Sequence, residues 1–415
     1  MKKQLLSLSI AATIASASLL TGMQSAVAET VIKSTTTTTI TKPLEVDDID
    51  MKQVIQIADQ QPKIEVVFVL DTTGSMSGLI KAAKEKIWSI ASTMAQAQTA
   101  PEIKMGLVGY RDRGDAYVTK TIDLSSDLDS MYSQLMDFRA QGGGDTPESV
   151  NKALYDAVHK MSWNQDKSTY KVVFLVGDAP AHMDYQDEVQ YPDTIKIASN
   201  KGIVINAIQS GQNRSTTKNW KRIANLGQSN FFQVGQSGNA VAIATPFDKE
   251  LATLSSELDK TRVYYGTVKE KQAQEAKVAA SAKLHTKSSI QSQARRAAFN
   301  TSASGKSNFL GEKELVDEVI RGDIDLSSID AEELPEEMKV MKPQAQLGYL
   351  KDKAEKREEL KSSIQQLTEK RDAFLKKKVK ASGQDKNSLD VQIFEAISEQ
   401  SAEKGLVYDK KDMKY

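Results

Sequence analysis

Short apolar runs alternate with stretches of helical spacing over residues 61–266. Five of these runs lie at 64–70, 103–109, 172–176, 203–208 and 231–234, and the first of them is rich in β-branched residues. A sixth, at 118–124, alternates apolar and polar residues as an edge strand does. Helical spacing covers 79–97, 128–138, 148–161, 194–200, 217–226 and 248–258. This alternation predicts an α/β fold, in which a doubly wound, mainly parallel sheet is flanked by helices.

Beyond residue 266 the strand pattern stops, which predicts a mostly α-helical C-terminal region at 267–415. Helical stretches there lie at 268–284, 288–299, 310–321, 344–380 and 391–397. The segment 344–380 has an imperfect heptad-like stripe of apolar residues among alternating Lys and Glu. Two interpretations stay open for it. It is either a coiled-coil segment for self-association or partner binding, or a charged surface helix packed on its neighbours.

The first 28 residues have the features of a secretory signal peptide. Lys2 and Lys3 precede an apolar stretch at 5–23, and the small residues Ala26 and Ala28 follow it. We therefore expect cleavage after Ala28, in preference to a membrane anchor, and an exported protein that is periplasmic or secreted. Residues 29–60, with a run of threonines at 35–39, predict a low-complexity linker.

Composition excludes several classes of function. Lys and Arg number 55, equal to the 55 Asp and Glu, and no region has the basic excess that nucleic-acid binding requires. The absence of cysteine excludes disulfides, thiolate metal sites and cysteine catalysis. No second long apolar stretch occurs, so no transmembrane segment is expected in the mature chain.

Oxygen-bearing side chains follow two of the predicted strands. Asp71, Thr73 and Ser75 come after the first strand at alternate positions, and in extended backbone such side chains point the same way. Asp178 follows the strand at 172–176, which we expect beside the first at the point where the strand order reverses. Thr146 follows three glycines and should cap a helix that begins at Pro147. Carboxylate and hydroxyl oxygens suit a hard cation such as Mg²⁺.

This set of residues resembles the von Willebrand factor type A domain over residues 61–266, and residues 71–76 are similar to the version common in bacterial members. The resemblance implies a metal-ion-dependent adhesion site with Asp71, Thr73, Ser75, Thr146 and Asp178 as ligands. It implies Mg²⁺, with Mn²⁺ or Ca²⁺ as alternatives, and a protein partner whose carboxylate completes the shell. Nothing in the resemblance covers residues 267–415.

Four further residues are expected near the same edge: Asp112, Asp145, His182 and Asp184. They could form a second metal site, or they are rim residues that contact solvent, Arg111 or Arg113. A base such as His182 beside a metal would suit a metal-dependent hydrolase, and a structural envelope protein acting through its helical tail is a further alternative. Because no Ser–His–Asp group or histidine pair stands out, we favour an exported, non-enzymatic protein-binding module.

Overall fold

The computed structural model describes residues 61–415 except 145, 239–242, 383–387 and 410–415. The predicted signal peptide at 1–28, the predicted linker at 29–60 and Asp145 lie outside the described residues. No helix within the described part is both long enough and apolar enough to cross a membrane.

The centre of the fold is a six-stranded sheet with the strand order β3-β2-β1-β4-β5-β6. All neighbouring strands are parallel except β3, which runs antiparallel to β2 at one edge. The strands are β1 (Lys63–Asp71), β2 (Glu102–Tyr110), β3 (Thr119–Ser125), β4 (Tyr170–Gly177), β5 (Ile203–Ser210) and β6 (Phe231–Val234). The predicted fold class is therefore confirmed, including the edge strand. The strand order reverses between β1 and β4, the strands that carry the candidate carboxylates.

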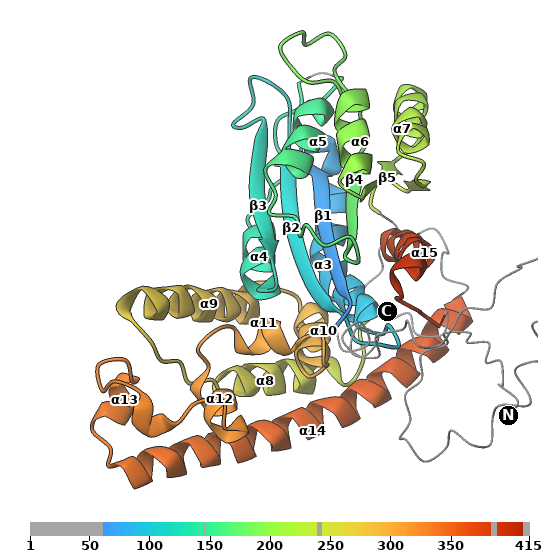
Figure 1. The fold of residues 1–415 in the computed structure, drawn as a ribbon. Coiled ribbons are helices and arrows are strands. Elements are labelled where there is room, and N and C mark those ends of the chain that lie inside the picture. Colours follow the sequence, from blue (N-terminus) through green and yellow to red (C-terminus); the bar gives the residue numbers. More distant parts are fainter. Residues whose placement is uncertain (1–60, 145, 239–242, 383–387, 410–415) are drawn as a thin grey trace, which may run out of the picture. The chain divides into compact units, whose positions relative to one another are not determined.

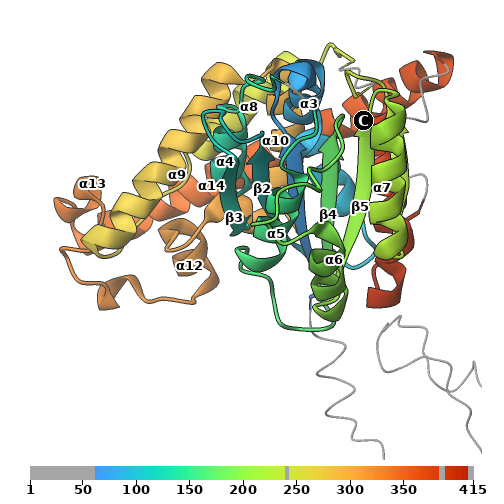
Figure 2. The ribbon, with the colours of Figure 1, turned by 90° about the horizontal axis from the view of Figure 1, so that it is seen from above.

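Both faces of the sheet are buried, which explains why its central strands are continuously apolar. Successive side chains of β1 enter two cores: Val66 and Phe68 pack with helices on one face, and Val67 and Val69 pack with helices on the other. The first face is covered by α3 (Ser77–Met94) and α4 (Leu128–Leu135). The second is covered by α5 (Val150–His159), α6 (Tyr191–Asn200) and α7 (Arg214–Leu226), as Figures 1 and 2 show.

The end of the chain completes the first face of the sheet. Helix α15 (Leu389–Gln400) packs beside α3, and its Leu389 and Ile393 belong to the same core as Phe68. The Tyr170 hydroxyl of β4 donates to Gln400 Oε1 over 2.8 Å, and Gln400 Nε2 donates to Asn206 of β5 over 2.8 Å. Residues from the far end of the sequence thus share one core with the α/β sheet.

The region after β6 is helical, as predicted. Its helices are α8 (Asp248–Asp259), α9 (Val268–Lys287), α10 (Ile290–Asn300), α11 (Lys306–Leu310), α12 (Leu315–Arg321), α13 (Glu336–Lys339) and α14 (Pro343–Ser382). This region also contains the short 3-10 helices η3 (Leu326–Ser328) and η4 (Ala402–Lys404), and a further one, η2 (Gly74–Met76), follows β1. Helix α9 begins where its sequence indicates, because Thr267 and Glu270 cap each other's backbone N–H in a capping box.

Helix α14 is 40 residues long and packs on helices of its own chain. Leu360 and Ile364, two positions of the predicted apolar stripe, join Leu251 of α8 and Phe309 of α11 in one core. Leu350 joins a second core with Leu315 of α12. The stripe is therefore used within the chain, in line with the packed-helix interpretation. Self-association through 344–380 stays a prediction.

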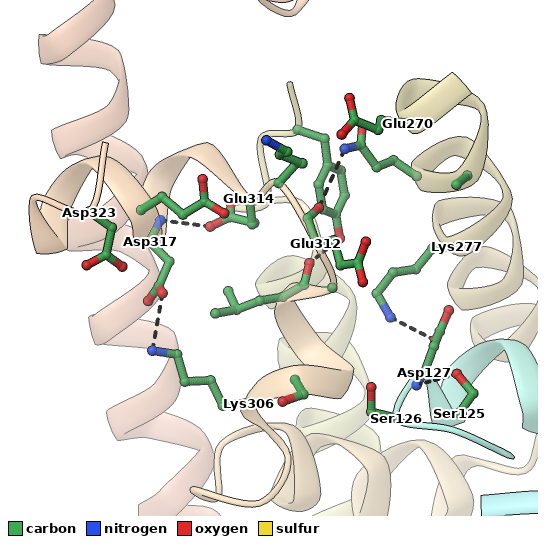
Figure 3. A pocket seen from close by; sticks show the side chains of 18 of the residues that line it. Ser125, Ser126, Asp127, Glu270, Lys277, Lys306, Glu312, Glu314, Asp317 and Asp323 are labelled. Atoms are coloured by element: carbon green, nitrogen blue, oxygen red, sulfur yellow. Dashed lines mark hydrogen bonds and ion pairs between the residues drawn. The ribbon is translucent and has the colours of Figure 1, made fainter. Parts of the chain in front are cut away.

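Where α9, α11 and α12 meet the β3–α4 loop, they enclose a cleft of about 670 Å³ (Figure 3). Ion pairs cross its walls: Lys277 lies 2.8 Å from Asp127 of the loop, and Lys306 lies 3.2 Å from Asp317 of α12. The Lys277 pair joins the α/β part of the chain to the helical part. The residues that line this cleft do not include any of the candidate metal ligands.

Candidate metal centre

Three oxygen-bearing side chains converge after β1. Asp71 is the last residue of the strand and is fully buried. Its Oδ1 accepts hydrogen bonds from the Thr73 backbone N–H over 2.8 Å and from the Thr73 hydroxyl over 2.6 Å. The Thr73 and Ser75 hydroxyl oxygens lie 3.4 Å apart. The alternate spacing therefore brings Asp71, Thr73 and Ser75 together, as the sequence predicts.

Asp178 reaches the same place from the neighbouring strand. Leu70 of β1 pairs with Val176 of β4, so the two strands end side by side. A Cβ added at Gly177 would lie only 3.0 Å from Asp71 Cβ, so a glycine is needed for this close approach. Gln236, in the loop after β6, joins the two strand ends. Its Nε2 donates to Asp178 Oδ2 over 2.6 Å and to the Ser75 carbonyl over 3.3 Å.

A glycine loop brings Thr146 to this edge. The Gly74 N–H donates to the Gly142 carbonyl over 3.1 Å, and Gly142 and Gly143 have φ values of 78° and 76° that favour glycine. Thr146 then shares the lining of a hollow of about 440 Å³ with Ser75 and Asp178. The other lining residues of this hollow are uncharged: Ser210, Gln212, Asn213 and Gln236. Asp71 and Thr73 are linked to this set through Ser75 and do not line the hollow themselves.

The predicted start of the helix after Thr146 is wrong. Helix α5 begins at Val150, and the Thr146–Pro147 peptide is cis. Between them Glu148 forms a parallel bridge with Ala181: its N–H donates to the Pro180 carbonyl over 2.9 Å. This pairing holds the backbone extended at Glu148, so Thr146 cannot cap the helix.

Glu148 is a residue of the site that the sequence reasoning missed. Its side chain is only 2% exposed, and its Oε2 has no hydrogen-bond partner. A Cβ added at Gly143 would lie 2.8 Å from Thr73 Cβ and 3.3 Å from Glu148 Oε1, so this carboxylate lies close to the Thr73 side of the site. The available signal was its position two residues after Thr146 in a loop that must approach the strand end.

Among the described residues, no lysine or arginine forms an ion pair with the carboxylates at this edge. Burial, followed by the charges of Asp71 and other acids, raises the pKa of Glu148 to about 9. Burial also raises the pKa of Asp71 to about 7, although the hydrogen bonds from Thr73 lower it. Asp71 Oδ2 and the Tyr110 hydroxyl are further buried atoms without a hydrogen-bond partner. No ion pair among the described residues involves Asp71, Glu148 or Asp178.

This arrangement fits a hard cation by two observations. Asp71 and Glu148 each have a buried carboxylate oxygen without a hydrogen-bond partner, no described lysine or arginine pairs with either, and a bound cation would compensate their charge. The donors are all oxygens, as Mg²⁺, Mn²⁺ or Ca²⁺ prefers. Within the described part of the chain, no group of three or more His, Cys, Asp or Glu could hold a metal. A metal here would therefore depend on the hydroxyls of Thr73, Ser75 and Thr146.

The expected rim residues form a separate hydrogen-bonded cluster. His182 Nε2 lies 3.2 Å from Asp112 Oδ2, and His182 Nδ1 lies 2.8 Å from Asp184 Oδ1. The Ser149 hydroxyl donates to Asp112 Oδ1 over 2.7 Å, and the Tyr185 hydroxyl donates to Asp112 Oδ2 over 2.9 Å. This cluster ties together the β2–β3 loop, the start of α5 and the β4–α6 loop. Asp145 lies outside the described residues.

Comparison with known proteins found one family model that matches the α/β part of the chain. Residues 65–245 match the family model described as von Willebrand factor A domain. A putative ariadne-like RING finger protein of Acanthamoeba polyphaga mimivirus is 27% identical over 124 residues, which are 30% of this chain and 12% of the relative. The alpha-protein kinase vwkA of Dictyostelium discoideum is 28% identical over 29% of this chain and 19% of its own. The human von Willebrand factor A domain-containing protein 7 is 37% identical over 99 residues, which are 24% of this chain and 10% of the human protein.

Three solved structures match 42% of this chain. Proximal thread matrix protein 1 of the mussel byssus is 16% identical with a TM-score of 0.33, covering 42% of each chain. A form of it with a zinc-occupied MIDAS motif has a TM-score of 0.32, with 16% identity over 42% of each chain. The SpRpn10 VWA domain is 15% identical with a TM-score of 0.32, covering 42% of this chain and 89% of its own. The curated relatives are matched over less than a fifth of their length. The family match thus supports a von Willebrand factor A domain over residues 65–245 of this chain.

Proposed function

We propose that this chain is an exported module that binds a protein partner through a divalent cation, with Mg²⁺ the preferred ion. Asp71, Thr73, Ser75, Thr146 and Asp178 would hold the ion at a metal-ion-dependent adhesion site. The observation that carries the proposal is that Asp71 Oδ2 is buried and has no hydrogen-bond partner. The Thr73 hydroxyl donates to the other oxygen of this carboxylate, Oδ1, and lies 3.4 Å from the Ser75 hydroxyl. The missing neighbour of this oxygen is best supplied by a cation.

The chain's own residues determine what such a site could bind. Mg²⁺ takes about six oxygen ligands and readily keeps waters, so it would supply a positive centre for one more oxygen ligand. The hollow beside Ser75, Thr146 and Asp178 is the route to that centre. Its other walls are the hydroxyl of Ser210 and the amides of Gln212, Asn213 and Gln236, which can hydrogen-bond a carboxylate without repelling it. An acidic side chain of a partner fits this chemistry.

The signal-peptide pattern at 1–28 supports export to a periplasm or to the exterior. The helical region would then serve as a spacer or effector attached to the binding module. The alternative is a structural envelope protein that works through this helical region. It would also be exported, but it would not bind a partner through a cation.

The hydrolase alternative requires His182 to act on a metal-bound substrate. Both ring nitrogens of His182 lie instead within 3.2 Å of a carboxylate, and the residue does not line the hollow. We therefore assign the His182 cluster a structural role in holding three loops together. Hydrolysis of an ester or phosphoester that disappears in His182→Ala would reverse that assignment.

The test is capture of a partner from envelope extract by the immobilised full-length protein. We expect Mg²⁺-dependent capture that EDTA and Asp71→Ala abolish, while Asp352→Asn, an exposed site on α14, leaves it unchanged. Substitution of the captured protein's acidic residues one at a time should identify the carboxylate that is needed. Equal capture by wild type, Asp71→Ala and EDTA-treated protein would disprove the proposed function.

A further inference from the structure

The cleft in Figure 3 is of the size that holds an organic molecule, with a volume of about 670 Å³. Its walls come from the β3–α4 loop of the α/β part and from α9, α11 and α12 of the helical part. Ala273, Leu310 and the ring of Tyr264 supply apolar surface among charged side chains. The cleft shares no lining residue with the hollow at the candidate metal centre.

A buried amide at this cleft is only half satisfied. Gln274 of α9 lines the cleft and is 8% exposed. Its Nε2 donates to the Tyr265 carbonyl over 2.9 Å and to the Glu312 carbonyl over 3.5 Å. Since both partners are acceptors, they determine which end of the amide is the nitrogen. Gln274 Oε1 is buried and accepts no hydrogen bond, so a ligand that brings a donor to this oxygen would remove an energetic cost.

The cationic side chains of the lining have partners within the fold. Three of the four form ion pairs with acids of the same lining. These pairs are Lys277 with Asp127 at 2.8 Å, Lys306 with Asp317 at 3.2 Å, and Arg321 with Asp317 and Asp323. The fourth, Lys313, lies 5.2 Å from the centre of the Tyr265 ring. Hydrogen bonds from Thr267, and to a smaller extent the charge of Lys313, lower the pKa of Glu270. The cleft therefore has no cation left for an anionic ligand.

Carboxylates outnumber cations in the same lining. It contains seven acidic side chains and four basic ones. Glu314 is compensated from outside the lining, because Arg357 of α14 lies 2.8 Å away. Among the described residues, neither Glu312 nor Glu318 forms an ion pair. The Glu318 carboxylate accepts a hydrogen bond from the Tyr265 hydroxyl over 2.6 Å, which leaves its charge in place. The cleft thus has an excess of negative charge.

We propose that this cleft binds a linear polyamine, a chain of methylene groups that carries ammonium groups. An ammonium group has three donors, so it can bond to Gln274 Oε1 and pair with the Glu312 carboxylate together. The charge of Glu318 would attract a second ammonium group, and the methylene groups would lie against Leu310 and Tyr264. A metal ion suits the cleft less well, because no group of three or more His, Cys, Asp or Glu in the described part of the chain could hold one. The inference does not depend on the proposed function.

The experiment is a calorimetric titration of the metal-free, full-length protein with spermidine at fixed ionic strength. We expect saturable binding at one site per chain. Butylamine, which carries one ammonium group, should bind at least about tenfold more weakly, and butanediol, which carries no charge, should not bind. Equal affinity for spermidine and butylamine would contradict a site for a polyamine.

The decisive variant is Glu312→Gln, which removes one charge of the site. Because Glu312 is exposed and outside every ion pair of the described residues, we expect this variant to fold as wild type does. Its affinity for spermidine should fall by about tenfold. The matched control is Glu275→Gln, which makes the same change in net charge at an exposed position of α9 outside the lining. This control should bind spermidine as wild type does.

Three results would overturn the proposal. The first is the absence of saturable spermidine binding by wild type. The second is equal affinity in Glu312→Gln and wild type. The third is an equal loss of affinity in Glu312→Gln and Glu275→Gln, since that would reflect the net charge of the protein and not a site in the cleft. Unfolding curves of both variants would confirm that they fold.

Discussion

Buried carboxylates occur in two regions of this molecule, and they differ in what faces them. At the junction of α4, α8 and α10, Arg296 Nε donates to Asp129 Oδ1 over 2.6 Å, and Arg296 Nη1 lies 2.9 Å from Asp259 Oδ2. Burial is the largest single contribution and raises the pKa of Asp129 and of Asp259, but the charge of Arg296, its hydrogen bonds and further cationic neighbours together outweigh burial and lower both pKa values. At the end of β1, burial raises the pKa of Asp71 to about 7 and that of Glu148 to about 9.

The opposite pKa shifts show which region compensates its buried carboxylates with cationic side chains of the chain itself. Asp129 and Asp71 are the same residue type and are both fully buried. Their pKa values move in opposite directions because Asp129 has a guanidinium partner and Asp71 has no cation among the described residues. We infer that the Arg296 junction with Asp129 and Asp259 is a structural lock, meaning that it stabilises the packing of the helical part on the α/β part. We also infer that the β1 edge is a binding site whose charge a cation would compensate.

The largest effect should come from breaking the lock. Asp129→Asn leaves the buried Arg296 with only part of its compensation, so we expect a loss of about 3–5 kcal/mol in the free energy of unfolding. Urea unfolding followed by tryptophan fluorescence would measure it. Asp352→Asn, on the exposed surface of α14, is the matched control and should change little. A loss below about 1 kcal/mol for Asp129→Asn would mean that the junction carries no net stability.

A smaller effect on the free energy of unfolding should appear at acidic pH. The folded-state pKa values of Asp129 and Asp259 are lowered, so their contribution to stability is present above the unfolded value near 3.8. It is lost as the pH falls through the folded pKa values, which lie below 3.8 for both carboxylates. Urea midpoints measured from pH 6 down to pH 2 should fall less steeply in Asp129→Asn than in wild type. Parallel curves would contradict this assignment.

The smallest effect is expected at the metal edge without metal. Because the pKa of Glu148 is about 9, its side chain is neutral at pH 7, and Glu148→Gln replaces one neutral group by another of similar shape. In EDTA at pH 7 this variant should lose less than about 1 kcal/mol of stability, well below the loss for Asp129→Asn. A comparable loss for both variants would show that Glu148 is charged and compensated in the ion-free fold, and the contrast between the regions would fail.

Much of this architecture could be predicted from the sequence, because local patterns encode it. The continuous apolar run of β1 fits a strand buried on both faces, and alternate spacing places the oxygens of Asp71, Thr73 and Ser75 together. The glycine run at 142–144 indicated a loop that must approach closely, and the positive φ values of Gly142 and Gly143 agree with it. The order of the ligand-bearing strands followed from the rule for doubly wound sheets.

What the sequence did not predict depends on contacts between distant residues. The place of α15 beside α3 rests on partners such as Gln400 and Tyr170, which lie 230 positions apart and carry no local signal. The start of α5 was misplaced because pairing between Glu148 and Ala181 overrides the preference of Pro147 for a first helical turn. The same pairing buries Glu148, which is why this carboxylate of the site was missed.

The central claim is that the β1 edge lacks a cation, and direct measurement of ion binding tests it. Calorimetric titration of the metal-free, full-length protein with Mg²⁺, and with Mn²⁺ as a spectroscopic substitute, should show one saturable site per chain. Asp71→Asn should weaken that site by at least about tenfold and leave the unfolding curve in EDTA nearly unchanged. Asp352→Asn should bind the ion as wild type does. Failure of wild type to bind either ion, or equal binding by Asp71→Asn, would contradict the account.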